Sequence, residues 1–158
     1  MNKTESNEKY KLRTPVTFSN YIPGCLSTIC ALQSDYYYRH WEFDVIYESV
    51  MAAGVSDFLT RFEPNKDFVQ VLLEDSQVVG GITIDRHRNE YAQLRWFFVA
   101  EHLHGSGIGK TLLSNAMSYV KQQKFKHVYL TTFNGLESAK YLYLQQGFKL
   151  KEEKKTVE

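Results

Sequence analysis

The stretch His104-Gly105-Ser106-Gly107-Ile108-Gly109-Lys110-Thr111 decides how this sequence is organised. An apolar run with the two-residue period of a β-strand precedes it, and a run with the apolar stripe of a helix follows it. Glycines let the backbone approach a ligand closely and adopt positive φ angles. A helix N-terminus adds unpaired N–H groups and the positive end of the helix dipole. The stretch therefore predicts a strand–loop–helix unit that can hold a phosphate group.

Hydrophobic periodicity on both sides of this loop predicts an α/β domain with a mixed sheet. The predicted order is β-α-α-β-β-β-α-β-α-β, and Gly147 is the expected C-terminal cap of the last helix. In the strand before the loop, Leu94, Trp96 and Phe98 are predicted to share one face. The strands are expected at 16–18, 68–73, 78–84, 91–99, 128–132 and from Phe148, and the helices at 25–40, 44–63, 108–120 and 136–143.

Length and composition fit one globular domain. The chain has 158 residues, of which 43% are hydrophobic and 23% charged, which is enough for a packed core. We expect residues 1–13 to form a flexible N-terminal lead-in and residues 14–158 to form a single domain. No apolar run approaches the ~20 residues of a membrane span, and the first residues lack the apolar stretch of a signal peptide. A cytoplasmic protein without membrane contact is therefore expected.

Charge and cysteine content exclude several other classes of protein. Nineteen basic and eighteen acidic residues leave a net charge of +1, so a general nucleic-acid binder is not expected. Two cysteines are too few for a disulfide framework, and the HxH pair at 102–104 lacks a third ligand, so no metal site is expected. Residues 21–63 hold six acidic and two basic residues, a net of −4, whereas residues 102–136 hold four basic residues and no acidic one. The first region favours a cation and the second an anion.

Two well-known phosphate-binding motifs fit the glycine loop only in part. A dinucleotide fingerprint GxGxxG that starts at Gly105 requires a glycine where Lys110 stands. A P-loop GxxxxGK(S/T) ends correctly in Gly109-Lys110-Thr111, but its first glycine would fall at His104. The next strand also lacks the aspartate that helps a P-loop enzyme to hold magnesium. Both motifs fail at a position that their chemistry needs, which disfavours a P-loop phosphate-transfer enzyme.

A third pattern covers nearly the whole chain. The sequence resembles the GCN5-related N-acetyltransferases, the GNAT superfamily, in four runs: LRWFFV (94–99), HGSGIGKTLL (104–113), YLTT (129–132) and AKYLYLQQGF (139–148). The resemblance extends from about residue 12 to residue 150, and LRWFFV and TTFNGLESAKYLY are similar to acetyltransferase domains fused to MarR-type regulators. It implies a GNAT-like fold, with a mostly antiparallel mixed sheet splayed at the fourth and fifth strands, and acetyl-CoA as the acyl donor.

The resemblance also assigns roles to individual residues. Backbone groups at the end of the strand 91–99 would pair with the pantetheine arm of acetyl-CoA, and amides of the glycine loop would hold its pyrophosphate. His104 opens this loop where relatives carry Gln or Arg, and Tyr143 matches the tyrosine that protonates the departing thiolate. The acetyl-CoA-binding residues that the resemblance implies are Phe97, Phe98, Val99, His104, Gly105, Ser106, Gly107, Ile108, Gly109 and Lys110.

Some positions depart from the family pattern. Leu136 stands where many relatives carry an asparagine that binds pantetheine, and Gln93 stands where some carry a glutamate base. The general base therefore stays open among Glu90, Glu101 and His102, which lie near the ends of the strand 91–99.

The acidic region 21–63 supplies the two helices that, by resemblance, flank the acceptor site. Tyr37, Glu42 and Glu48 are its candidate acceptor-binding residues, and the alternative is that its aromatic residues only pack a helix junction. The reaction expected from the resemblance is direct attack of a primary amine on acetyl-CoA in a ternary complex. The amine would belong to a small molecule or to a lysine-bearing protein.

A function without catalysis is the second hypothesis. The same fold would then bind acyl-CoA as a sensor without turnover, which the departures at Gln93 and Leu136 allow. The chain also ends about ten residues after Gly147-Phe148, before the sixth and seventh strands of the family. This predicts either a shortened sheet or a homodimer in which a second subunit completes it.

Overall fold

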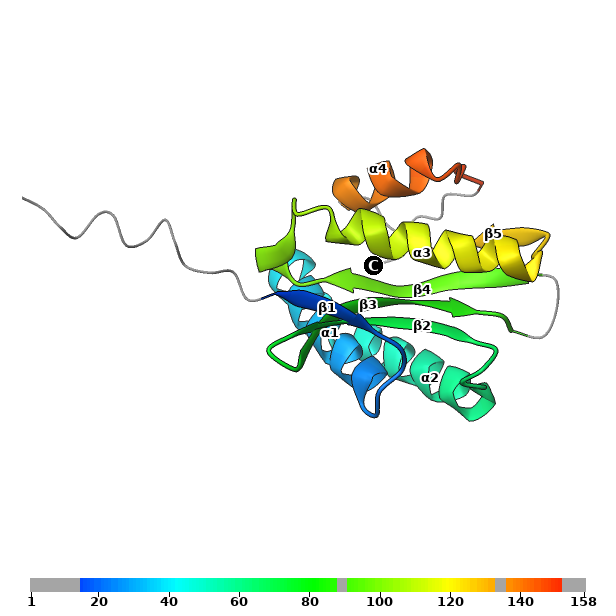
Figure 1. Cartoon of the computed structure of the whole chain (residues 1–158). Coiled ribbons are helices and arrows are strands. Elements are labelled where there is room, and N and C mark those ends of the chain that lie inside the picture. The colour runs from blue at the N-terminus through cyan, green and yellow to red at the C-terminus, as the bar shows by residue number, and fades with distance from the viewer. Residues whose placement is uncertain (1–14, 88–90, 133–135, 152–158) are drawn as a thin grey trace, which may run out of the picture.

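The computed structural model describes residues 15–87, 91–132 and 136–151, so the predicted lead-in 1–13 lies outside the described residues. One sheet separates two layers of helices, with α1 and α2 on one face and α3 and α4 on the other (Figure 1). The strands are β1 (Val16–Ser19), β2 (Phe68–Glu74), β3 (Gln77–Asp85), β4 (Tyr91–Val99) and β5 (His127–Tyr129). The helices are α1 (Cys25–Trp41), α2 (Val45–Arg61), α3 (Ile108–Gln123) and α4 (Glu137–Gln145), with a 3-10 turn at Glu101–Leu103.

The predicted mixed sheet is confirmed, and it opens between its fourth and fifth strands. The strand order is β1-β2-β3-β4-β5, antiparallel as far as β4, and β5 joins β4 in parallel. These last two strands are paired only from Tyr91 to Gln93 and from His127 to Tyr129. Beyond Gln93, no described strand pairs with β4 on that side, so its edge is open along the part that leads to the glycine loop.

A β-bulge in β4 changes which of its side chains share a face. The register with β3 slips between Gly81 and Thr83, and Trp96 adopts a positive φ of 50°. One extra residue in β4 shifts the alternation of its side chains. Leu94 packs in the core beneath α3, whereas Trp96 and Phe98 pack in the core beneath α1 and α2. The prediction that these three residues share a face is therefore wrong, and the bulge is the reason.

Two helix ends follow from local sequence signals, as predicted. The Asp44 side chain accepts the N–H of Ile46 at 3.0 Å and caps α2. At the end of α4, Gly147 has a φ of 92°, and the N–H of Phe148 donates to the carbonyl of Tyr143 at 3.1 Å. This is the hydrogen bond of a Schellman motif, and it fixes the helix turn that carries Tyr143.

The chain after α4 differs from the prediction. Residues 148–151 form no strand, and Leu150 is 72% exposed. β5 also ends at Tyr129 and does not reach Thr132. A strand needs partners for its backbone groups, and the described part of the chain offers none at these positions. The predicted final strand is therefore wrong for residues 148–151.

Candidate active site

The glycine loop ends in a helix N-terminus that no side chain caps. Gly107 is the N-cap residue of α3 with a φ of 84°, and Gly105 has a φ of 78°. Both angles lie in the left-handed region that favours glycine. A Cβ atom at either position would meet nothing within 4 Å, so the loop borders open space. The first N–H groups of α3 are therefore available to a ligand.

Side chains of the loop fix it to the end of β4. His104 Nε2 lies 2.7 Å from the carbonyl oxygen of Val99. The hydroxyl of Ser106 donates to the carbonyl of Leu103, and the N–H of Ser106 donates to the same carbonyl at 3.3 Å. His104 therefore holds the loop beside the open edge, while Ser106 satisfies its own amide within the loop.

The open edge of β4 presents the backbone of Phe97 and Val99. The N–H of Ala100 donates to a carbonyl of β3 at 2.9 Å, and successive residues of a strand turn their backbone groups to opposite sides. Phe98 therefore turns its backbone toward β3, and its neighbours turn theirs to the open edge. The Phe97 carbonyl accepts a hydrogen bond from Gln33 Nε2 at 3.4 Å. Since His104 occupies the Val99 carbonyl, the edge offers a ligand chiefly the N–H groups of Phe97 and Val99.

Tyr143 of α4 lies beside this edge. Its half-buried ring packs edge-on against the rings of Phe97 and Phe148, with centroids 6.0 Å apart in each pair. Burial raises the pKa of Tyr143 above its ordinary value, and the nearby Tyr37 raises it further. The phenol therefore keeps its proton at neutral pH and can act as a proton donor.

The candidate acceptor-binding residues gather at the junction of α1 and α2. Tyr37 is 7% exposed and packs against Trp41 and Tyr47, so its ring belongs to the core of this junction. Glu42 and Glu48 are exposed, and Glu42 ends α1 with a φ of 58°. The three residues thus share one region, with two carboxylates on its surface.

Two of the three candidate bases are held in side-chain pairs just after the end of β4 that leads into the glycine loop. Glu101 binds His40 at 2.7 Å, and this partner, with a nearby arginine, holds the pKa of Glu101 below its ordinary value. His102 binds Glu74 at 2.8 Å. Both follow the end of β4 that leads into the glycine loop, not the end where β4 pairs with β5. Glu90 lies outside the described residues.

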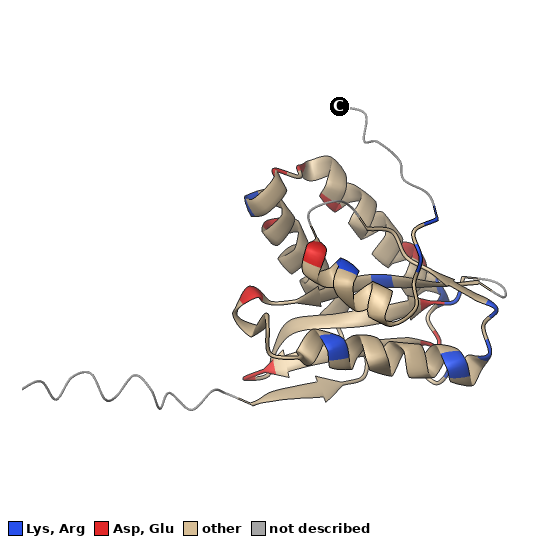
Figure 2. Cartoon of the chain, turned by 90° about the horizontal axis from the view of Figure 1, so that it is seen from above, with Lys and Arg blue, Asp and Glu red and all other residues tan. Residues whose placement is uncertain are grey.

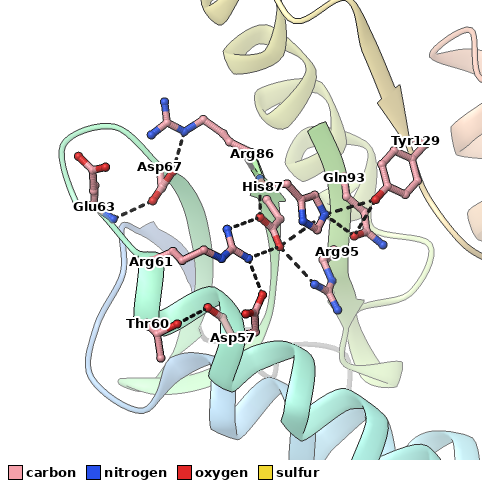
Figure 3. A network of polar contacts seen from close by, with 11 residues as sticks. Asp57, Thr60, Arg61, Glu63, Asp67, Arg86, His87, Gln93, Arg95 and Tyr129 are labelled. Atoms are coloured by element: carbon pink, nitrogen blue, oxygen red, sulfur yellow. Dashed lines mark hydrogen bonds and ion pairs between the residues drawn. The ribbon is translucent and has the colours of Figure 1, made fainter. Parts of the chain in front are cut away.

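Sequence reasoning missed a polar network on the α2 face of the sheet, where β3 ends and β4 begins (Figure 3). Its centre is the fully buried side chain of Asp85. Arg61 binds both carboxylate oxygens, at 3.1 and 3.2 Å, and Arg95 binds one of them at 3.2 Å. Burial by itself raises the pKa of Asp85, but Arg61 and the N–H of His87 hold it below its ordinary value. Arg95, the arginine of the apolar run LRWFFV, was the sequence signal that could have revealed this network. An arginine in a buried strand is rare unless it is paired with an acidic group.

The charges along α3, which begins at the glycine loop, favour an anion. Along α3, Figure 2 shows basic residues and no acidic ones.

A groove of about 490 Å³ between α1 and α2, lined by residues such as Cys30, Val55 and Leu59, contains none of the predicted site residues. Within the described ranges, no three His, Cys, Asp or Glu side chains gather as a metal site would require. No helix of these ranges is both long and apolar enough to cross a membrane.

Comparison with known proteins decides the family. The sequence model of the Acetyltransferase (GNAT) family matches residues 26–148. This chain belongs to the GNAT acetyltransferase family. The match runs from α1 to the residue after Gly147, and it therefore includes the glycine loop, the open edge of β4 and Tyr143.

Solved structures of acetyltransferases share the fold. A GNAT-family acetyltransferase from Staphylococcus aureus Mu50 is 20% identical over 85% of each chain, with a TM-score of 0.68. A ribosomal-protein-alanine N-acetyltransferase from Brucella melitensis is 21% identical over 84% of each chain, with a TM-score of 0.63. A predicted acetyltransferase from Clostridium acetobutylicum, solved with acetyl-CoA, is 11% identical over 91% of this chain and 96% of its own, with a TM-score of 0.67. A comparison with curated proteins found no match.

Proposed function

We propose that this GNAT domain transfers the acetyl group of acetyl-CoA to a primary amine, by direct attack of the amine in a ternary complex. The observation that supports this most is the meeting of three features at one place. They are the uncapped N-terminus of α3, the open edge of β4 and the proton-bearing hydroxyl of Tyr143. Because no Cβ atom stands over the loop at Gly105 or Gly107, its shape fits a pyrophosphate group.

Each feature supplies one requirement of the reaction. The loop amides bind the pyrophosphate of acetyl-CoA, and Lys110 adds a positive charge beside them. The N–H groups of Phe97 and Val99 pair with the pantetheine arm as an added strand would. A preorganised N–H of this edge is also suited to stabilise negative charge on the thioester oxygen. Tyr143 gives its proton to the departing sulfur.

The acceptor must be captured as a cation and deprotonated. With an ordinary pKa near 10.4, roughly one primary amine in a few thousand is uncharged at pH 7. Glu42 and Glu48 are exposed residues of the acidic region 21–63, and their carboxylates attract such a cation. A small-molecule amine and a lysine-bearing protein both satisfy this chemistry. A cytoplasmic location is part of the proposal, since acetyl-CoA must be supplied.

A panel of amines tests the proposal. Acetyl-CoA and CoA binding are measured first by calorimetry, and release of free thiol is then followed with small amines, polyamines and lysine peptides. We expect binding of both nucleotides and thiol release with at least one amine. Binding of acetyl-CoA without thiol release from any amine would instead favour the sensor function. The amide at Gln93 is compatible with that function, because an amide does not act as a general base.

A further inference from the structure

Gln93 and Tyr129 mark the point where β4 and β5 part. They are the last paired residues of these two strands, so they lie at the closed end of the opening along β4. The glycine loop follows Val99, at the other end of that opening. If the loop holds the pyrophosphate, as in the proposed function on which this inference rests, the acyl end of the donor extends along the edge toward Gln93 and Tyr129.

His87 lies against this pair (Figure 3). Its Nε2 atom is 2.9 Å from Gln93 Oε1 and 3.3 Å from the hydroxyl of Tyr129, and its side chain is 37% exposed. The Tyr129 hydroxyl donates to the same Gln93 oxygen at 3.3 Å. Because an amide oxygen only accepts hydrogen bonds, Nε2 is the donor to Gln93, and in the neutral imidazole the lone pair is then on Nδ1. No described residue is hydrogen-bonded to Nδ1.

The charged groups around His87 balance one another. The carboxylate of Asp85 lies 3.8 Å from Nε2 and accepts the N–H of His87 at 2.8 Å. Arg61 and Arg95 both bind Asp85, and Asp57 binds Arg61. Two carboxylates and two guanidinium groups, from α2, β3 and β4, therefore form a paired network that reaches His87 through Asp85.

We propose that His87 is the proton acceptor of the acetyl transfer, and that Gln93 and Tyr129 are positioning residues that hold its ring. The Nδ1 lone pair takes one proton from the substrate ammonium through water, which leaves the amine lone pair to form the C–N bond. The C–S bond breaks as sulfur takes the proton of Tyr143, and the amide nitrogen gives its second proton to the resulting tyrosinate. One proton remains on His87 and passes to solvent, which balances the reaction.

His87→Gly tests this assignment with little risk to the fold, because residue 87 has a φ of 48°, which glycine adopts readily. We expect kcat/KM for the amine to fall about 100-fold, with acetyl-CoA affinity and melting temperature little changed. Added imidazole should restore turnover in a saturable manner, since it supplies the missing base. The matched control is His127→Gln, because His127 is exposed and stacks on Tyr91 at the start of the same strand pair.

The pH profile is a readout that a merely structural role would not change. In the parent, kcat/KM should fall toward low pH, because an imidazole that already carries a proton cannot accept one from the amine. His87→Gly should lose this acidic limb, and His127→Gln should keep it. Gln93→Leu and Tyr129→Phe should lower kcat/KM by smaller factors, since each removes one contact of the ring while the base remains.

The failures of the two proposals can be told apart. If the parent releases thiol and His87→Gly keeps the parental rate and acidic limb, the role of His87 is overturned and the proposed function stands. If the variant loses turnover but imidazole restores none of it, His87 is a structural residue and the assignment is again overturned. If the parent binds acetyl-CoA but acetylates no amine, both proposals fall together.

Discussion

Gly107→Ala tests whether the N-terminus of α3 holds the pyrophosphate of acetyl-CoA, and the chain contains a closely matched control. Gly24 and Gly107 are the N-cap residues of α1 and α3, with φ of 83° and 84° and ψ of −4° and −2°. Neither helix start has a side-chain cap, and a Cβ atom at either position would meet nothing within 4 Å. Alanine therefore perturbs the two helix starts in the same way, but only Gly107 lies in the glycine loop.

The expected magnitudes follow from this geometry. An L-residue in the left-handed region costs about 1–2 kcal/mol, so each variant should lower the melting temperature by about 2–8 °C. At Gly107, the added methyl group also stands where a phosphate would approach the amides. Loss of one hydrogen bond to a charged group costs about 1.5–3 kcal/mol, which weakens binding roughly 10- to 150-fold.

Calorimetric titration with acetyl-CoA, together with thermal unfolding of each variant, measures both effects. We expect similar losses of stability in the two variants and weakened acetyl-CoA binding in Gly107→Ala alone. Equal dissociation constants for acetyl-CoA in the two variants would refute the assignment of the pyrophosphate to the glycine loop, because the added methyl group would then have the same effect inside and outside that loop.

Three further predictions concern other parts of the molecule. Tyr143→Phe should lower kcat by a factor of about 10 or more with little change in acetyl-CoA affinity, since the ring is kept and only the proton donor is lost; an unchanged kcat, with chemistry limiting, would contradict this. Asp85→Asn should lower the free energy of unfolding at pH 7 by about 3 kcal/mol, because it removes the buried anion bound by Arg61. The pKa of Asp85 is lowered in the fold. The contribution of its carboxylate to stability is therefore fully present above the ordinary value near 3.9 and is lost as pH falls through the lower folded-state value. Denaturant unfolding should accordingly show a smaller difference in the free energy of unfolding between the parent and Asp85→Asn at about pH 3 than at pH 7. Glu48→Gln should raise KM for the amine and leave that for acetyl-CoA unchanged, and because Glu48 lies about 20 Å along α2 from Arg61 and the His87 network, the increase should be larger for a polyamine or lysine peptide than for a short monoamine.

Local signals in the sequence predicted most of the fold. Asp44 before an apolar stripe predicted the start of α2, and the glycines at 105–109 predicted the loop before α3. Such features depend on residues close in sequence, so their spacing reveals them. The final strand was not predictable in this way, because a strand depends on a partner elsewhere in the chain.

The site shows the same division between local and distant effects. The glycine loop and Tyr143 belong to continuous motifs, whereas the bulge at Trp96 depends on the register between β4 and β3. His87 and Tyr129 are 42 residues apart in sequence and meet only through the parallel pairing of β4 and β5. The alternation pattern alone gave neither the bulge nor this meeting.

The most direct test of acetyl transfer is to count both products of one reaction. The parent protein is incubated with acetyl-CoA and a productive amine, free thiol is titrated, and the acetylated amine is quantified by mass spectrometry. Direct attack in a ternary complex predicts one acetylated amine for each thiol released, and no acetyl group on the protein when the amine is left out. Tight binding of acetyl-CoA without either product, or an acetyl group found on the protein itself, would contradict the proposed function.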